Sequence, residues 1–301
     1  MKKILIVGGT GFIGYHLAKK ALRKGWRVYS ISTSAPKKKR YIPKVKYKIC
    51  DITNKKKLKK NINQYFDYVV NLGGYVEHSH RVKTIKSHYH GCKNLADILI
   101  KNPPRTFVQM GSGNEYGKLN SPHNEKANCR PISIYGNAKL SSTKYLINLF
   151  KRKHFPSVVL RLYQAYGPKQ DTNRLIPQAI ESFLKNKKFP CSTGNQFRDF
   201  VHIEDVVGAI IQSLVLESSK GEIINIGSGK PKTIKSIILT ILKIIGKGEA
   251  QFGKIKMRKD EILKIYPNVK KAQKTIKWSS KISLQKGLKR TVRSYSESFR
   301  N

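Results

Sequence analysis

A tyrosine and a lysine four residues apart have the chemistry to exchange a proton with a substrate hydroxyl or ketone. Tyr135 and Lys139 share one face of a helix predicted to begin near Ile132, where the ammonium would stabilise a phenolate. The spacing alone is not selective, because three other pairs have it: Tyr15 and Lys19, Tyr89 and Lys93, Tyr266 and Lys270. Position selects Tyr135, since of these four tyrosines it alone lies on the helix that comes next after the fifth predicted strand, whose end carries Ser112. We expect Ser112 to hydrogen-bond the same reacting oxygen, so the predicted catalytic residues are Ser112, Tyr135 and Lys139.

A glycine-rich loop near the start of the sequence predicts a dinucleotide site. The apolar run 4–7 leads into Gly-Gly-Thr-Gly-Phe-Ile-Gly over residues 8–14, where an amphipathic helix begins. Glycines at this spacing permit a tight turn, close approach of the backbone to a pyrophosphate, and close packing of helix on strand. The free N–H groups at the start of the helix would face the phosphates. The predicted contacts are Gly8, Thr10, Gly11, Phe12, Ile13 and Gly14.

The end of the second predicted strand bears on the choice between NADP and NAD. An acidic residue there would bind the ribose hydroxyls of NAD, but this chain has Ser32, Thr33 and Ser34, followed by the basic run 37–40. Hydroxyls beside cations suit a 2′-phosphate and favour NADP, although lysine is frequent throughout the chain and NAD stays open. Asp51, which precedes Ile52 after the third strand, is expected either to bind the adenine amino group or to cap a helix.

These residues need a parallel α/β sheet to bring them together. Short apolar segments alternate with segments whose apolar residues recur every three to four positions, which indicates a Rossmann-type doubly wound sheet. The predicted strands are 3–7, 27–31, 45–49, 68–72, 106–110 and 157–162, and the helices are 12–24, 55–62, 82–100 and 132–153. The rhythm changes after residue 167, with helices predicted over 175–187, 203–216, 234–245 and 284–295, and extended pieces at 200–201 and 222–226. We expect a dinucleotide-binding domain over 1–166 and a smaller C-terminal α/β substrate domain over 167–301, with part of 199–220 returning to the first.

Composition and charge exclude several classes of protein. The chain has 301 residues, of which 39% are apolar, and no apolar run reaches the roughly 18 residues of a membrane helix. Four widely spaced cysteines without a CxxC pair fit reduced cytoplasmic thiols and predict no metal site. The formal net charge of +44 would ordinarily suggest nucleic acid, but only 14 of the 61 basic residues are arginine. We therefore favour scattered lysines on solvated faces and expect no specific nucleic-acid partner.

An ordered series of further motifs runs along the chain. It comprises residues 71–74, 115–117, 161–168, 173–177, 196–205 and 225–229, Arg258, and the segment from Trp278 to Thr291. With the glycine loop, Ser112 and the Tyr135/Lys139 pair, this series resembles the extended short-chain dehydrogenases/reductases of the NAD-dependent epimerase/dehydratase type, which act on nucleotide-activated sugars. The resemblance implies a Rossmann domain and a smaller domain that grips a nucleoside diphosphate. It also implies cofactor contacts from Ile52, Leu72, Gly73, Gly74, Tyr135 and Lys139.

The resemblance further implies where the substrate binds. In the family, arginines at the positions of Arg198 and Arg258 contact the nucleotide or its diphosphate, although a surface ion pair is the alternative for each. The expected substrate residues are Ser112, Gly113, Asn114, Gln164, Arg174, Leu175, Ile176, Arg198 and Arg258. The family commonly dimerises through the helices predicted here over 82–100 and 132–153, so a homodimer is expected.

Departures from the family pattern narrow the chemistry. Family 4,6-dehydratases carry an Asp-Glu pair just after the catalytic hydroxyl residue, where this chain has Gly113 and Asn114, so dehydration is disfavoured. Glu115 is one place off, and we expect it to point elsewhere on an extended segment. Gln164 replaces the usual Asn after the sixth strand, which puts that sugar contact in doubt.

Three histidines have alternative interpretations. His88 stands where the family has an Asn in the crossover helix, and it is either a packing residue or part of an altered proton path. His78 and His80 follow the fourth strand and either face the sugar or lie in a solvated loop.

The favoured function is an NADP-dependent reductase of a nucleotide-linked 4-keto sugar, with Tyr135 as proton donor. The alternative is a nucleotide-sugar C4 epimerase that holds NAD tightly and uses the same catalytic residues. A dinucleotide-binding protein without catalysis is less favoured, because the catalytic residues are all present. Surface-polysaccharide precursors are the expected destination of such sugars.

Overall fold

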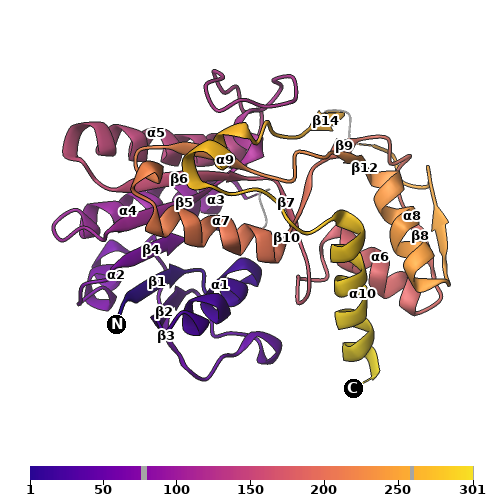
Figure 1. Cartoon of the computed structure of the whole chain (residues 1–301), viewed down its shortest axis with the longest axis horizontal. Helices are drawn as coiled ribbons and strands as arrows, with labels where there is room; N and C mark the ends of the chain where they lie inside the picture. Colours follow the sequence, from indigo (N-terminus) through magenta and orange to yellow (C-terminus); the bar gives the residue numbers. More distant parts are fainter. Residues whose placement is uncertain (76–79, 258–260, 301) are drawn as a thin grey trace.

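Seven parallel strands form the central sheet of this computed structural model, which describes residues 1–75, 80–257 and 261–300 (Figure 1). The spatial order is β11-β6-β5-β4-β1-β2-β3. The bounds are β1 (Lys3–Val7), β2 (Arg27–Ser32), β3 (Val45–Ile49), β4 (Tyr68–Asn71), β5 (Thr106–Ser112), β6 (Ser157–Leu162) and β11 (Ile223–Ile226). The strand order reverses beside β1, and ligands of such sheets bind outside the carboxyl ends of the strands at that point. The predicted α/β class and Rossmann-type sheet are confirmed.

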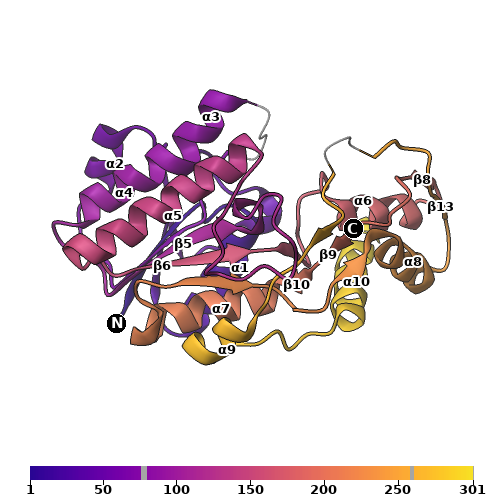
Figure 2. The same cartoon turned by 90° about the horizontal axis from the view of Figure 1, so that it is seen from above.

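Helices cover both faces of the sheet (Figure 2). Ile4 and Ile6 of β1 belong to one hydrophobic core, whereas Leu5 and Val7 belong to another, because successive side chains of a strand point to opposite faces. The first core includes α1 (Phe12–Arg23), α7 (Ile203–Val215) and α9 (Lys270–Ile276). The second includes α2 (Lys55–Asn61), α4 (Gly91–Leu99) and α5 (Ile134–Lys153). Burial on both faces explains the near-continuous apolar strand sequences.

The crossover helix predicted over 82–100 is present over residues 81–99, but a π turn interrupts its α-helical hydrogen bonding. α3 (Arg81–Ile85) is followed by η2 (Lys86–His90), a five-residue π-helical turn, and then by α4. A π turn inserts one extra residue into a helix, and such turns are frequent at functional sites. The periodicity of apolar residues in the sequence does not reveal a π turn. The segment around Glu115 also differs from the prediction, since η3 (Gly113–Glu115) is a 3₁₀ turn rather than extended chain.

A third hydrophobic core lies at the other end of the molecule, among α6 (Leu175–Leu184), α8 (Ile234–Ile245) and α10 (Leu284–Arg300) (Figures 1 and 2). Short strands surround these helices: β7 (Gln164–Tyr166), β8 (Lys188–Pro190), β9 (Phe197–Arg198), β10 (Phe200–His202), β12 (Lys232–Thr233), β13 (Glu249–Gln251) and β14 (Lys264–Ile265). Two 3₁₀ turns, η1 (Lys38–Arg40) and η4 (Glu217–Ser219), complete the elements named here. The division of the chain at residue 166 stays a prediction.

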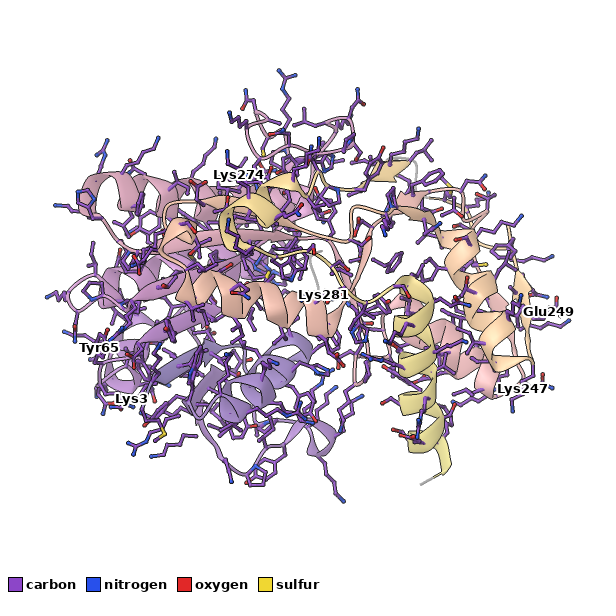
Figure 3. All side chains as sticks on the ribbon, in the orientation of Figure 1. Lys3, Tyr65, Lys247, Glu249, Lys274 and Lys281 are labelled. Carbon is purple, nitrogen blue, oxygen red and sulfur yellow. The ribbon has the colours of Figure 1, made fainter. Side chains whose placement is uncertain are left out.

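Lysines are spread over the molecule. Figure 3 labels Lys3 on β1, Lys247 after α8, Lys274 on α9 and Lys281 before α10, and they lie far apart. Such a distribution fits solvated lysines better than one binding patch. Within residues 1–75, 80–257 and 261–300, no helix combines the length and the apolar character needed to cross a bilayer.

Candidate active site

A cavity of about 740 Å³ opens where β1, β2, β3 and β4 end. It is lined by every residue predicted to contact the cofactor in the glycine loop, at the end of β3 and at the end of β4, and also by Ser32 and Thr33. Ser34, Tyr135 and Lys139 were predicted with them but do not line it. The parallel strands all deliver their carboxyl ends to this edge of the sheet, which is why segments distant in sequence meet here.

The glycine loop fits a dinucleotide diphosphate. Gly11 precedes α1, and no side chain caps the N–H groups of that helix, so they are available to an anion. A Cβ on Gly14 would lie 2.5 Å from Gly9 Cα, so only glycine permits the close packing of α1 against the loop. Gly8 has φ +79°, and its position would bring a Cβ within 3.1 Å of the Leu72 and Gly73 backbone. The loop is therefore shaped by backbone contacts, as close approach to a pyrophosphate requires.

Polar groups at the adenosine end of the cavity are already engaged with the protein. The Ser32 hydroxyl accepts a hydrogen bond from the Thr10 N–H at 3.3 Å. Asp51 accepts from the Thr53 N–H at 2.8 Å, but Asn54 caps α2, so the capping alternative for Asp51 is wrong. Asp51 still lines the cavity and stays a predicted adenine contact.

Arg40, from the basic run that favoured NADP, is 3% exposed. Its Nε and Nη2 donate to the Lys169 carbonyl at 3.0 and 2.6 Å, and Nη2 also pairs with Asp171 at 3.0 Å. Lys37 lies 3.6 Å from the same carboxylate. The guanidinium is thus committed to a distant segment, which weakens the argument that this basic run awaits a 2′-phosphate.

The three predicted catalytic residues come from β5 and α5, which lie against each other. Ser112 is the last residue of β5 and is buried. Lys139 on α5 donates from Nζ to the Met110 carbonyl of β5 at 2.7 Å and lies 5.7 Å from the centre of the Tyr135 ring. Lys139 therefore ties the helix that carries Tyr135 to the strand that carries Ser112. Tyr135 is half-buried, one helical turn before the lysine.

Glu115 supports this arrangement, a role that the sequence did not indicate. Its side chain is fully buried and accepts from the Ser112 N–H at 2.9 Å, the Thr143 hydroxyl at 2.8 Å and Arg161 Nε at 2.8 Å. These donors belong to β5, α5 and β6. Glu115 points away from the cavity, as expected, but toward a buried guanidinium. An arginine within the apolar strand 157–162 was the available signal, because a buried charge needs a partner.

His88 packs against the predicted catalytic tyrosine. Its ring meets the Tyr135 ring edge-on with centroids 4.9 Å apart, and its Nε2 lies 3.1 Å from the Tyr75 carbonyl. A Cβ on Gly74 would overlap the His88 ring, so Gly74 makes room for it. His88 therefore makes the packing contact that was one of its two expected roles, and a part in proton transfer stays a prediction. His80 is exposed and caps α3 through Nδ1, whereas His78 lies outside the described residues.

A second cavity of about 530 Å³ holds many of the predicted substrate residues. Gln164, Arg174, Leu175, Ile176 and Arg198 line it, and Gln164 and Arg174 line the first cavity as well. The two cavities are therefore neighbours, as a cofactor and a substrate that react require. Ser112, Gly113 and Asn114 line neither cavity, and Arg258 lies outside the described residues.

Arg198 donates to the Glu261 carboxylate and to the Phe197 carbonyl at 2.8 Å. Burial lowers the pKa of the Arg198 guanidinium. Arg198 thus forms an ion pair, but with Glu261 in the lining of the second cavity rather than at the surface, and its contact with the nucleotide stays a prediction. The sequence did not indicate Glu261. Tyr163 lines the first cavity and lies within hydrogen-bonding distance of His123. Because burial raises the pKa of its phenol well above the usual range, Tyr163 makes this contact as a neutral group.

Comparisons with known proteins agree with this geometry. A model of the NAD-dependent epimerase/dehydratase family matches residues 4–227. The chain is 31% identical to a putative UDP-glucose 4-epimerase of Methanocaldococcus jannaschii, over 96% of this chain and 97% of that one. The UDP-glucose 4-epimerase of Thermotoga maritima, solved with UDP-glucose, superimposes with a TM-score of 0.93 at 26% identity over 99% of both chains. The UDP-glucuronic acid 4-epimerase of Bacillus cereus, solved with UDP-glucuronic acid and NAD, gives a TM-score of 0.88 at 25% identity over 98% of this chain and 99% of that one.

The family match spans the glycine loop, the strands that position it and the helix of Tyr135 alike. The chain therefore belongs to the NAD-dependent epimerase/dehydratase family and is an enzyme of that family.

Proposed function

We propose that the protein is a nucleotide-sugar 4-epimerase that retains NAD, which is the alternative to the reductase expected from the sequence. The observation that carries the choice is the engagement of Arg40 with Lys169 and Asp171, which weakens the argument for NADP drawn from the basic run 37–40. The end-to-end similarity to a putative UDP-glucose 4-epimerase supports it. A UDP-sugar is accordingly the proposed substrate.

The residues that line the two cavities, together with those of β5 and α5, suit such a reaction. Bound NAD would supply a reversible hydride acceptor, held by the glycine loop and the ends of β2, β3 and β4. Tyr135 would take the proton of the sugar 4-hydroxyl and return it, with Lys139 stabilising the phenolate. Ser112 would hydrogen-bond the same oxygen, while the cavity lined by Leu175, Ile176 and Arg174 would hold the nucleotide. Gly113 and Asn114 supply no acid/base pair for dehydration.

The test uses the purified chain with UDP-glucose and no added cofactor. We expect formation of the 4-epimer, and a stoichiometric amount of NAD released on denaturation. Tyr135→Phe should lower the rate by about 10²–10⁴-fold. Tyr89→Phe is the matched control, because Tyr89 has the same spacing to a lysine but lies on η2, and it should retain activity. No epimer from wild-type protein, or full activity in Tyr135→Phe, would contradict the proposal.

The second candidate is the NADPH-dependent 4-keto-sugar reductase. It is favoured by the absence of an acidic residue at the end of β2, where Ser32 and Thr33 line the cavity. A protein purified without dinucleotide, which consumes NADPH in proportion to a nucleotide-linked keto sugar, would replace the epimerase with this function.

A further inference from the structure

A four-residue segment, Pro168–Asp171, connects β7 to the loop before α6 and lies against the first half of the chain. Arg40 binds it at two points, through the Lys169 carbonyl and the Asp171 carboxylate. The guanidinium is almost fully buried, and its planar group can satisfy both acceptors at once. Lys169 adopts φ +64°, a conformation that non-glycine residues rarely take, so the contacts hold the segment in an unusual backbone shape.

Three further contacts hold the same segment. His16 on α1 donates from Nε2 to the Pro168 carbonyl at 2.9 Å. Lys169 Nζ donates to the Lys39 carbonyl at 2.6 Å. The Tyr295 hydroxyl of α10 donates to the Gln170 carbonyl at 2.5 Å. The segment is therefore attached both to the β2–β3 connection and to the C-terminal helix.

This segment forms part of the wall of the dinucleotide cavity. Gln170 and Asp171 line that cavity together with Ser32 and Thr33, the residues at the adenosine end. Arg40 follows Ser32 and Thr33 in the chain and joins their loop to the segment. A dinucleotide in the cavity would thus be enclosed between two pieces of backbone that Arg40 holds together.

We propose that Pro168–Asp171 is a clasp, fastened by Arg40, that must open before the dinucleotide can leave. Arg40 is then a positioning residue that sets the residence time of the cofactor without touching the reacting atoms. The inference rests on the proposed function, in which the enzyme keeps its cofactor through many turnovers. Its physical basis is independent of the sugar: the clasp acts on release of whichever dinucleotide is bound.

The test measures the release rate of a bound reduced dinucleotide. Protein loaded with NADH, or with NADPH if that binds instead, is mixed with a large excess of the oxidised form, and the loss of fluorescence is followed. Arg40→Lys keeps the charge but cannot reach both acceptors, so loss of one charge-assisted hydrogen bond should raise the release rate about tenfold or more. Asp171→Asn, which removes the carboxylate charge and keeps its shape, should also raise it. Arg27→Lys, at the exposed opposite end of β2, should leave it unchanged.

An unchanged release rate in both Arg40→Lys and Asp171→Asn would overturn the clasp. If Arg40→Lys does not fold, Asp171→Asn alone decides. A merely structural role would lower the thermal stability of the dinucleotide-free protein without changing release relative to Arg27→Lys. The epimerase proposal is tested separately, because it fails if no 4-epimer forms. If the protein proves to be a reductase and Arg40→Lys still releases the dinucleotide faster, the proposed function is refuted but the clasp is supported.

Discussion

Replacing Glu115 with glutamine tests how β5 and α5, which carry the predicted catalytic residues, are held together. The carboxylate is fully buried and is the ion-pair partner of Arg161, which is only 2% exposed, at 2.8 Å. Glu115→Gln keeps the shape of the side chain but removes its charge and turns one accepting oxygen into a donating amide. At least one of the three donors that now face the carboxylate then loses its acceptor.

The magnitude follows from the burial of both charges. Removing one member of a buried ion pair leaves the other charge desolvated and uncompensated, which costs about 3–5 kcal/mol of the free energy of unfolding. The Arg161 guanidinium also stacks on the Tyr116 ring, with its Cζ 4.6 Å from the ring centre, so it cannot leave for solvent without disrupting that packing. We expect Glu115→Gln to lose an amount in this range. We also expect it to lower turnover, because Glu115 holds the Ser112 N–H.

Urea unfolding followed by circular dichroism measures the loss. The matched control is Glu297→Gln, the same substitution in the exposed pair of Glu297 with Arg293, where the expected change is below about 1 kcal/mol. In Glu115→Gln combined with Arg161→Met, no unpaired charge is left, so this double variant should be more stable than Glu115→Gln alone.

A Glu115→Gln protein within about 1 kcal/mol of wild type would refute the reasoning, since that is the range expected of an exposed pair. A double variant less stable than the single one would show that the cost lies in lost packing rather than in the uncompensated charge.

Three other predictions follow from single features. Gly14→Ala should weaken dinucleotide binding in titration calorimetry, because the new Cβ meets the backbone of the glycine loop and overpacking costs about 1–3 kcal/mol. Gly208→Ala is the control and should bind normally, because its Cβ meets Trp278 only at an ordinary 3.5 Å. Burial lowers the pKa of His16 to about 4, so between about pH 6.5 and pH 4 the unfolded chain takes up a proton that the folded chain resists. The free energy of unfolding should therefore fall by about 1–2 kcal/mol from pH 7 to pH 5, and His16→Gln should lose that part of the slope in urea titrations. A homodimer through the faces of α3, α4 and α5 is expected in sedimentation velocity, and a single 34.3 kDa species would contradict it.

Local sequence patterns predicted the elements that a short stretch of chain can specify. The strand 157–162 and the helix 234–245 were predicted with the bounds that the structure shows, because continuous apolar runs and a regular helical period mark them directly. The π turn over 86–90 was not predicted, because its hydrogen bonds depend on how the helix packs rather than on the composition of the helix. The basic run 37–40 was interpreted from its charge alone. Only the fold revealed that Arg40 binds the Lys169 carbonyl and the Asp171 carboxylate.

The sequence by itself determined the parallel sheet, and it predicted the dinucleotide loop and selected Tyr135 among four equally spaced Tyr/Lys pairs. Apolar periodicity, glycine placement and order along the chain can all be read without the fold. Only the tertiary structure decided the partners of the buried charges. Glu115 meets Arg161 46 residues later, and Arg40 meets the Lys169 carbonyl 129 residues later. The physical reason is that a buried charge is stabilised by whichever opposite group the folded chain brings within hydrogen-bonding distance, and that group is set by the path of the backbone rather than by the neighbouring sequence.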